Sequence, residues 1–428
     1  MNVVLIVVGG SYMGDMSQLD ISSSFSYRGF FGGKKLLVIV PHQDDEINVA
    51  GSTIIGSIAE GLDVSLAFMT NGDWEYDVPL RNNEAIDAAK ILGLSSQNIY
   101  FLDYPDCGYD TYSVYEHKDS IFNYRNRNIS WEILLQDIEH LIVSVQPHSI
   151  ICTGFDSHRD HRQCEEAVLT VMKKLWKSGS TIRLYTTFAY GNAYESIDDW
   201  RSIHWCSSVM NPKSHPEQWS TPSKDLSWES RLRIPIPKSC RGNILIKNPI
   251  YLALTAHASQ AAYRHSMQLI NSDQVYWYRE PKINDNINKP YYLQILINQQ
   301  FAYEWITYKG EKKADISIYL GSLKNGKEIS SENSNLIWYC NGVFINSCTY
   351  ETILDFMANN NLDKVHLRCE LKNIPDIYCE CILKKGTYWD RFTLGIHWIK
   401  DWILYKWDHH KRKKKYKRIR KTRRVFSI

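Results

Sequence analysis

Two short polar segments of this 428-residue chain hold residue types that could carry out metal-assisted hydrolysis. Segment 41–46 contains one histidine, two aspartates and one glutamate, and segment 153–161 contains two histidines and two aspartates. A hydrolytic zinc site needs three protein ligands, usually histidine and carboxylate, with one coordination position left for water. It also needs a base beside that water and a group that stabilises the oxyanion. Together, the two segments contain enough side chains for all of these roles.

The candidate assignments are His42, Asp45 and His161 as metal ligands, Asp44 as the base and His158 as the oxyanion partner. Each segment alone permits a simpler interpretation. A histidine pair three residues apart is more often part of a polar loop or a helix cap than of a metal site. The acidic triplet is suited to a helix N-terminus, where carboxylates interact favourably with the helix dipole. Capping is a poorer explanation if both segments lie at the active edge of one sheet.

The surrounding sequence predicts the elements that would place these segments together. Strand and helix patterns alternate between about residues 35 and 190. The expected strands are 36–40, 64–69, 99–102, 149–152 and 182–190, and the expected helices are 46–60, 81–92, 131–145 and 163–176. This alternation is typical of an α/β fold with a Rossmann-like, doubly wound and mostly parallel sheet. Such sheets bind ligands at the carboxyl ends of their strands, and both polar segments follow a predicted strand.

The remainder of the chain has a different pattern. Residues 191–250 are proline-rich and predict a long irregular region over the sheet, and residues 249–270 have a helical pattern. Short β-rich runs separated by turn residues between 289 and 385 predict a small second domain. The runs around Trp338 and Cys369 resemble the Trp and Cys strands of an immunoglobulin-like sandwich. An unrelated small β domain is an equally good interpretation.

Composition excludes several classes of protein. With 14 Trp, 27 Tyr and 13 Phe, the chain is too aromatic to be a solvated coil. No stretch approaches the roughly 20 consecutive apolar residues that a membrane-spanning helix needs. The ten cysteines include no CxxC pair, so zinc-ribbon and dithiol redox motifs are absent. We therefore expect reduced thiols in a cytoplasmic protein.

The charge is unevenly distributed along the chain. Residues 411–428 contain 11 of the 50 Lys and Arg residues and no acid, which leaves 39 basic against all 47 acidic residues in the rest. Before this tail, Phe392, Ile396, Ile399 and Ile403 fall on one helical stripe beside three tryptophans. This pattern is typical of a helix that lies on an anionic membrane surface, here peripherally at the inner face. The alternatives are an ordinary helix with a solvated tail and, ranked last, a basic arm on nucleic acid.

Taken in order, the motifs resemble those of the PIG-L (LmbE-like) family of zinc-dependent N-acetylglucosaminyl deacetylases. The family signature is a strand followed by HPDDE and a later HxDH, which read here as HQDDE at 42–46 and HRDH at 158–161. Further matching segments are TNGD at 70–73, RNNE at 81–84, YPDCG at 104–108 and AHASQ at 256–260. Gln43 replaces the signature proline, which fixes φ but supplies no ligand. The resemblance covers about residues 35–270.

This resemblance implies a Zn²⁺ cofactor, with another divalent transition metal as the alternative. It implies removal of the acetyl group from an N-acetylglucosamine-type sugar or glycoconjugate by activated water, with Asp44 as general base. It further implies that Asp160 orients His158, which stabilises the tetrahedral intermediate or protonates the amine. Arg81 and Asp106 match positions that approach the sugar or its aglycone. The implied metal ligands are His42, Asp45 and His161.

Two other functions are compatible with the same motifs. One is an amidase that uses this chemistry on a different acyl-amine, and the other is a non-catalytic glycan-binding or scaffold protein with the same fold. The expected domain organisation has four parts: an N-terminal extension at 1–34, a PIG-L-like domain at 35–280, a small β-sandwich-like domain at 289–388, and an amphipathic helix with its polybasic tail at 391–428.

Overall fold

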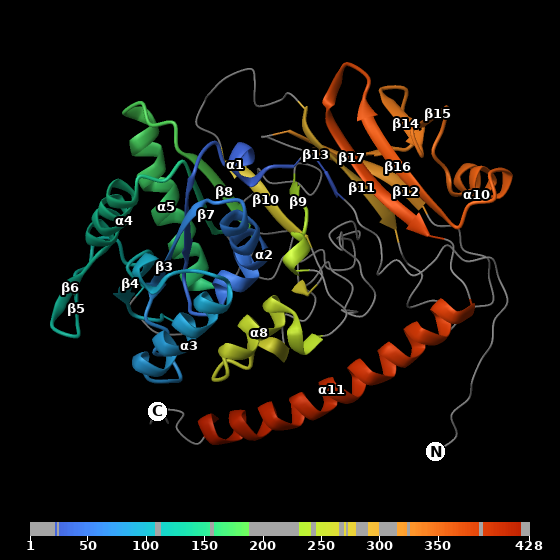
Figure 1. The fold of residues 1–428 in the computed structure, drawn as a ribbon. Coiled ribbons are helices and arrows are strands. Elements are labelled where there is room, and N and C mark those ends of the chain that lie inside the picture. The colour runs from blue at the N-terminus through green and yellow to red at the C-terminus, as the bar shows by residue number, and fades with distance from the viewer. Residues whose placement is uncertain are drawn as a thin grey trace. The chain divides into compact units, whose positions relative to one another are not determined.

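A computed structural model of the chain describes residues 22–23, 25–107, 113–154, 158–187, 231–240, 245–264, 269–270, 273–279, 290–298, 315–322, 326–384 and 388–420 (Figure 1). Most of the predicted irregular region, the end of the strand expected at 182–190 and the last eight residues of the basic tail lie outside the described residues. The chain divides into two compact units. The larger unit contains residues 25–291, 320–327 and 401–428, and the smaller unit contains residues 1–24, 292–319 and 328–400.

The larger unit is built on a seven-stranded sheet with the order β4-β3-β2-β7-β8-β10-β9. Its parallel strands are β2 (Lys35–Val40), β3 (Asp63–Thr70), β4 (Ile99–Tyr104), β7 (Ser149–Thr153) and β8 (Arg183–Thr187). β10 (Gln274–Arg279) pairs antiparallel with both β8 and β9 (Leu232–Ile234). The predicted mostly parallel α/β sheet is confirmed, and two antiparallel strands that were not predicted extend it.

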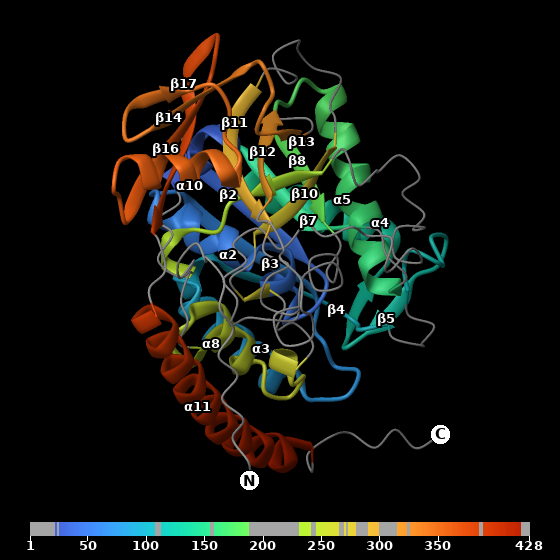
Figure 2. The same cartoon turned by 90° about the vertical axis from the view of Figure 1, so that its right-hand side faces the viewer.

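Helices cover both faces of this sheet (Figures 1 and 2). One face carries α4 (Trp131–Val145) and α5 (Arg159–Lys177), and the other carries α2 (Asp45–Ala59), α3 (Val78–Ile91) and α8 (Pro249–Ala256). Leu37 and Ile39 of β2 belong to the core formed with α4 and α5, whereas Leu36 and Val38 point to the opposite face, and all four are fully buried. Because both faces are covered, the strand is a continuous apolar run without polar alternation.

The helix predicted at 249–270 is shorter in the structure. α8 ends at Ala256, and a 3₁₀ turn (η8, Ala262–Arg264) follows. His257 leaves the helical conformation with a ψ of 61°. The backbone N–H of Ser259 then donates to the carboxylate of Glu84 on α3, at 2.9 Å. Polar partners on a neighbouring helix thus replace the hydrogen bonds that would have continued α8.

Several short elements complete the larger unit. They are α1 (Tyr27–Phe30), the hairpin strands β5 (Phe122–Tyr124) and β6 (Arg127–Ile129), and the 3₁₀ turns η2 (Ser96–Asn98), η6 (Lys238–Cys240) and η7 (Leu245–Lys247). The two residues between β5 and β6, Arg125 and Asn126, have φ values of 51° and 64°. Positive φ at both central residues is the conformation of a tight two-residue hairpin turn.

The smaller unit is β-rich, as predicted. One sheet has the order β1-β17-β16-β14-β15, and a second has the order β11-β12-β13. The elements are β1 (Ser22–Ser23), β11 (Pro290–Asn298), β12 (Asp315–Ser322), β13 (Gly326–Ser330), β14 (Leu336–Cys340), β15 (Val343–Ile345), α10 (Tyr350–Asn359), β16 (Lys364–Leu371) and β17 (Ile374–Lys384). Trp338 and Cys369 lie directly opposite each other on adjacent antiparallel strands, and both are buried. The helix α10 was not part of the immunoglobulin-like interpretation.

The last described element is α11 (Tyr388–Arg420), a continuous helix of 33 residues. It begins three residues before the helical segment expected at 391. Among the helices in the described part of the chain, none combines the length and the apolar character that crossing a membrane requires.

Candidate active site

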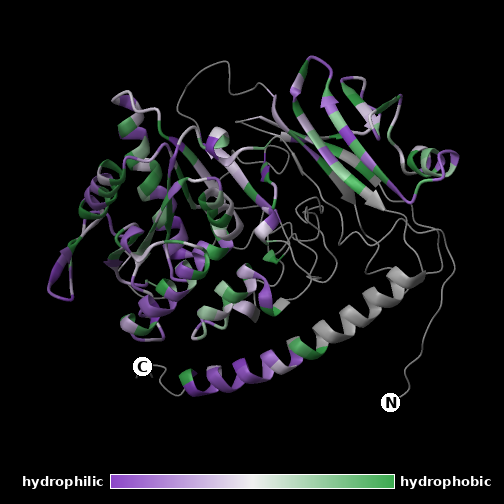
Figure 3. Ribbon diagram, viewed as in Figure 1, coloured by the Kyte–Doolittle hydropathy of each residue, from purple (hydrophilic) through white to green (hydrophobic). Residues whose placement is uncertain are grey.

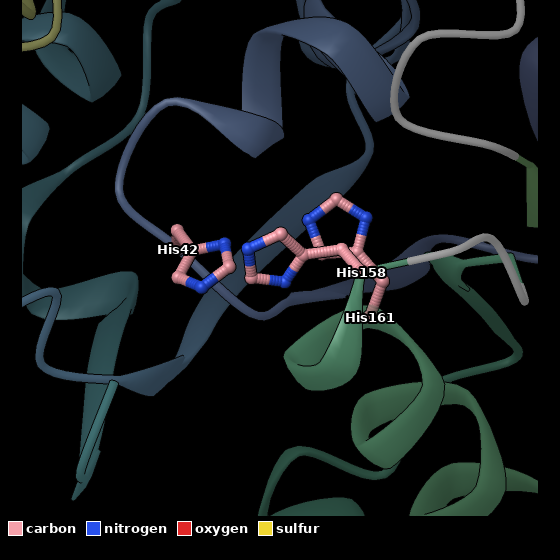
Figure 4. A group of neighbouring side chains, drawn as sticks. All are labelled: His42, His158 and His161. Atoms are coloured by element: carbon pink, nitrogen blue, oxygen red, sulfur yellow. The ribbon is translucent and has the colours of Figure 1, made fainter. Parts of the chain in front are cut away.

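The ends of two neighbouring strands hold the candidate site. His42 follows β2, and His158 caps the N-terminus of α5, the helix that follows β7. Because β2 and β7 are adjacent and parallel, their carboxyl ends lie at one edge of the sheet. Figure 4 shows the three rings of His42, His158 and His161 gathered there. The ring centroid of His42 lies 4.8 Å from that of His158 and 5.3 Å from that of His161, and the last two are 4.7 Å apart.

Asp45 links two of these histidines. Its Oδ2 lies 3.0 Å from Nδ1 of His42 and 3.3 Å from Nε2 of His161. Tetrahedral zinc with bonds of about 2.0–2.1 Å separates two ligand atoms by about 3.3 Å, so this spacing suits ligands of a single ion. Donor atoms of His42, His158 and His161 also lie within 4.8 Å of one another. The structure thus brings His42, Asp45 and His161 into contact. The side chains whose ligand atoms all lie within 4.8 Å of one another form two groups in the described part of the chain: His42, His158 and His161, and His42, Asp106 and Asp160.

Two further carboxylates face the other ring nitrogen of His42. Oδ2 of Asp160 lies 3.2 Å from Nε2 of His42, and Oδ1 of Asp106 lies 3.8 Å from the same atom. Asp160 was expected to orient His158, but its carboxylate is 3.8 Å from Nδ1 of that ring. The backbone N–H of Asp160 donates to this Nδ1 instead, at 3.3 Å. Asp160 therefore contacts His42 through its side chain and orients His158 through its backbone.

These carboxylates favour positive charge at the centre of the group. Burial alone would lower the pKa of His42, but the three carboxylates around it raise the pKa well above its usual range. Burial opposes ionisation of Asp45, yet His161 and His42 hold the pKa of that carboxyl well below its usual range. For His158, burial and then the positive charge of the other two histidines lower the pKa to about 4. A metal ion would supply the positive charge that the protonated histidines otherwise provide, so the donor set fits a cation.

Asp44, the predicted base, adopts a backbone conformation that few residues adopt. Its φ is 145° and its ψ is −20°, and such values persist only where the surroundings enforce them. Its N–H donates to Oε2 of Glu46 at 2.9 Å, and Nη2 of Arg81 lies 3.8 Å from its Oδ1. Burial raises the pKa of Asp44 to about 6, with Arg81 opposing the shift. The carboxylate next to the candidate ligands can therefore exchange a proton near neutral pH.

Comparison with known proteins agrees with this geometry. Residues 37–172 match the family PIG-L, described as GlcNAc-PI de-N-acetylase. This segment is a PIG-L domain. Over these residues, the resemblance to the PIG-L family drawn from the motifs is confirmed. No curated protein matches the chain in sequence.

Three similar solved structures illustrate the range of proteins around this PIG-L domain. N,N′-diacetylchitobiose deacetylase from Pyrococcus horikoshii is 21% identical with a TM-score of 0.29, over 38% of this chain and 63% of that one. The A40926 pseudoaglycone deacetylase Dbv21 is 15% identical with a TM-score of 0.36, over 59% of this chain and 99% of that one. The 4-carboxy-2-hydroxymuconate hydratase GalB from Pseudomonas putida KT2440 is 14% identical with a TM-score of 0.36, also over 59% and 99%. The chain thus spans less than two thirds of the diacetylchitobiose deacetylase.

Arg81 and Gln43 brace the signature segment of the PIG-L domain. Arg81, which was expected to approach the sugar or its aglycone, is 4% exposed, and its Nη2 donates to the backbone oxygen of Gln43 at 2.7 Å. Gln43 stands where the family signature has proline. Its side-chain amide donates to the backbone oxygen of Thr70 and to Oδ1 of Asn82, both at 3.1 Å. Proline could make neither bond, so Gln43 ties the turn to β3 and α3 by different means.

Two residues outside the predicted site set also support it. Nε2 of His257 lies 2.6 Å from Oε1 of Glu46, and both side chains are fully buried. The other oxygen of Glu46 accepts the N–H of Asp44, so the pair holds the strained residue from behind the site. His257 lies beyond the matched range 37–172. The signal for both residues was their place in the HQDDE and AHASQ segments, although the sequence did not show that these two segments meet.

Proposed function

We propose that this protein is a metal-dependent N-deacetylase that acts on an N-acetylated amino sugar, such as N-acetylglucosamine, or on a conjugate of one. One observation carries the proposal: Oδ2 of Asp45 lies 3.0 Å from Nδ1 of His42 and 3.3 Å from Nε2 of His161, although the segments are more than a hundred residues apart. This convergence stands beside a half-buried carboxylate, Asp44, in the position of a base. The PIG-L match supports the acetamide as the bond that is cleaved.

His42, Asp45 and His161 are the residues that would hold the metal ion, and Zn²⁺ suits two imidazoles and one carboxylate. When bound, Zn²⁺ supplies Lewis acidity that polarises the amide carbonyl and lowers the pKa of a water molecule. Asp160 steadies His42 from its other ring nitrogen, at 3.2 Å. Such outer partners orient metal-binding histidines and raise their basicity.

Asp44 moves the proton in the proposed reaction. It accepts the proton that water loses as the oxygen attacks the acetyl carbon, and it returns that proton to the nitrogen as the C–N bond breaks. Acetate and the free amine are the products. A pKa of about 6 suits both steps, because the group is mostly ionised at neutral pH yet still basic enough to hold the proton.

His158 acts in this proposal as a neutral hydrogen-bond donor. Its Nδ1 accepts the backbone N–H of Asp160, so the proton of the neutral ring lies on Nε2. With its pKa lowered to about 4, the ring stays uncharged at neutral pH. It can therefore stabilise the oxyanion by donating from Nε2, and the proton for the leaving amine comes from Asp44.

Metal content and acetate release test the proposal. We expect the purified protein to contain about one divalent ion, and to release acetate from N-acetylglucosamine conjugates. Chelation should abolish the release, and added Zn²⁺ should restore it. His161→Ala should lose both metal and activity, whereas the control His140→Ala, on the exposed side of α4, should keep both.

Two results would contradict the proposal. Metal-loaded protein that hydrolyses only acyl-amines without a sugar would be an amidase of another specificity. Metal-loaded protein that binds N-acetylated glycans without releasing acetate would be a non-catalytic glycan-binding protein.

A further inference from the structure

The C-terminal half of α11 is fastened to the larger unit along one side. Oδ2 of Asp408 accepts hydrogen bonds from the hydroxyl of Tyr251 on α8, at 2.5 Å, and from Nε of Arg412, at 2.6 Å. The guanidinium of Arg412 also lies 5.4 Å from the ring centroid of Tyr251. The ring of His409 lies 6.1 Å from that of Tyr263. This side of the helix is therefore fixed against α8 and the turn that follows it.

The same side continues toward the loop that leads into α3. Tyr76 in that loop is only 2% exposed. Burial raises the pKa of Tyr76, and the neighbouring Tyr416 raises it further while Arg420 opposes the shift, so the last turns of α11 lie near this loop. Arg81, five residues after Tyr76, contacts the Asp44 segment.

The opposite side of this half-helix is exposed and strongly basic. Asp408, the one acid between 402 and 420, is occupied by the contacts described above. We call the exposed basic residues the basic face; they are Lys406, Lys411, Lys413, Lys414, Lys415, Lys417, Arg418 and Arg420. Figure 3 shows the last turns of α11 as hydrophilic. Because the contacting side is fixed, the basic face has a defined direction and is not a disordered tail.

Two large apolar side chains adjoin the basic face. Ile403 is 55% exposed and Trp407 is 57% exposed. They lie one helical turn apart, and Nζ of Lys411, a further turn along, is 3.6 Å from the centroid of the Trp407 ring. Basic residues continuous with exposed tryptophan and isoleucine are typical of a helix that lies in the interface of an anionic bilayer. Nucleic acid would use the charges and can stack a base on Trp407, but it offers no apolar layer for Ile403.

We propose that the basic face, with Ile403 and Trp407, docks the protein on the surface of an anionic lipid bilayer. Basic residues near such a surface each add an increment of attraction, so eight on one side make a strong combined site. The apolar pair adds burial at the acyl boundary, which the charges alone do not supply. The helix lies on the bilayer without crossing it. This proposal does not depend on the deacetylase activity.

Binding of the full-length protein to lipid vesicles tests the proposal. We expect it to float with vesicles of phosphatidylcholine mixed with phosphatidylserine, to float poorly with phosphatidylcholine alone, and to be released by salt. Replacing Lys413, Lys414, Lys417 and Arg418 with Glu should weaken binding to anionic vesicles by roughly 100-fold or more. The matched control, with Glu at Lys90, Lys173, Lys177 and Lys247, changes the net charge equally at exposed positions elsewhere and should bind as the wild type does.

A second variant tests the apolar part. Trp407→Ala should weaken vesicle binding by about tenfold, the effect of losing one partly buried aromatic side chain. Circular dichroism and thermal unfolding establish that each variant is folded. Three results would each overturn the proposal. The matched control could lose as much vesicle binding as the basic-face variant, or the basic-face variant could bind vesicles as the wild type does. The third is a wild-type protein that binds RNA or DNA tightly and does not bind vesicles.

Discussion

The candidate active site and the basic face of α11 both concentrate charged side chains, but they do so in opposite ways. At the site, His42, Asp45 and Asp160 are buried, and each has a partner of opposite charge within 3.3 Å. On the basic face, exposed residues of one sign lie side by side in water. Removing the partner of a buried charge strongly destabilises the folded protein, whereas a single exposed charge contributes little to its stability. Function should therefore depend on single residues at the site and on the sum of residues along α11.

Asp44→Asn should give the largest effect of the single substitutions that leave the expected metal ligands in place. Asparagine keeps the shape but cannot accept the proton from water, so turnover should fall by roughly 10²–10⁴-fold. Metal content should stay close to that of the wild type, because Asp44 is not among the expected ligands. Acetate release and metal analysis on the same preparation check both parts.

Full turnover by Asp44→Asn would show that another group is the base. Loss of metal together with turnover would place Asp44 among the ligands. Either result would mean that Asp44 does not have the separate role of base at the candidate active site. The contrast with α11, where residues act only as a sum, would then be weaker.

Glu46→Gln should have a smaller effect, because Glu46 acts on the reaction only through Asp44. Glutamine is uncharged and cannot pair with His257 as the carboxylate does at 2.6 Å, so the support behind Asp44 is weakened. We expect kcat to fall by roughly 10–100-fold, the range for outer partners of metal sites, with little change in KM.

Glu84→Gln is the matched control for this prediction. Glu84 is also a buried glutamate, and it accepts both the N–H and the hydroxyl of Ser259 without contacting Asp44. It should lower stability while leaving kcat of the folded protein near the wild-type value. Equal losses of kcat in the two variants would show that Glu46 acts through general packing and not by positioning Asp44.

The Glu46–His257 pair should also make stability depend on pH. Burial alone would lower the pKa of His257, but the charge of Glu46 raises it above its usual value. The contribution of the protonated His257 to the free energy of unfolding is therefore complete below about pH 6.5, the pKa of a histidine in the unfolded chain. It is lost as the pH rises through the higher pKa of His257 in the folded protein. Each unit between the two pKa values corresponds to about 1.4 kcal/mol.

His257→Gln should remove this component. The free energy of unfolding of the wild type and of the variant can be compared by urea unfolding at pH 6 and pH 8.5, with metal removed by a chelator. Between these two pH values, the wild type should lose more stability than the variant does. Parallel losses would mean that His257 is neutral in the folded protein and that the pair is an ordinary hydrogen bond.

The sequence predicted the framework of the site better than its side-chain partners. Buried parallel strands are continuous apolar runs, and their carboxyl ends mark the site, so the meeting of His42 with His161 could be expected. The side-chain contact of Asp160 with His42 could not, because it depends on rotamers chosen in a crowded space. The strands β9 and β10 were missed for a related reason. They are short, and their pairing joins segments far apart in the chain.

The direction of α11 likewise came only from the structure. The sequence placed Ile403 on an apolar stripe, which by itself fits either packing against the protein or contact with a membrane. The structure fixes the opposite side through Asp408 and Arg412, which leaves Ile403 exposed. Which side of a helix is covered depends on its tertiary partners, and periodicity alone cannot supply them.

Single substitutions on the basic face should have the smallest effects, and they test the other half of the comparison. Lys414→Ala should weaken binding to anionic vesicles by only about fivefold, because one lysine near such a surface contributes about 1 kcal/mol. The control Lys173→Ala, on α5, should not change binding, and neither variant should change acetate release from a water-soluble substrate. A loss of 100-fold or more in Lys414→Ala would mean that this lysine fills a specific headgroup pocket. In that case the basic face would resemble the buried site, where one residue decides the outcome, and the contrast between the two regions would fail.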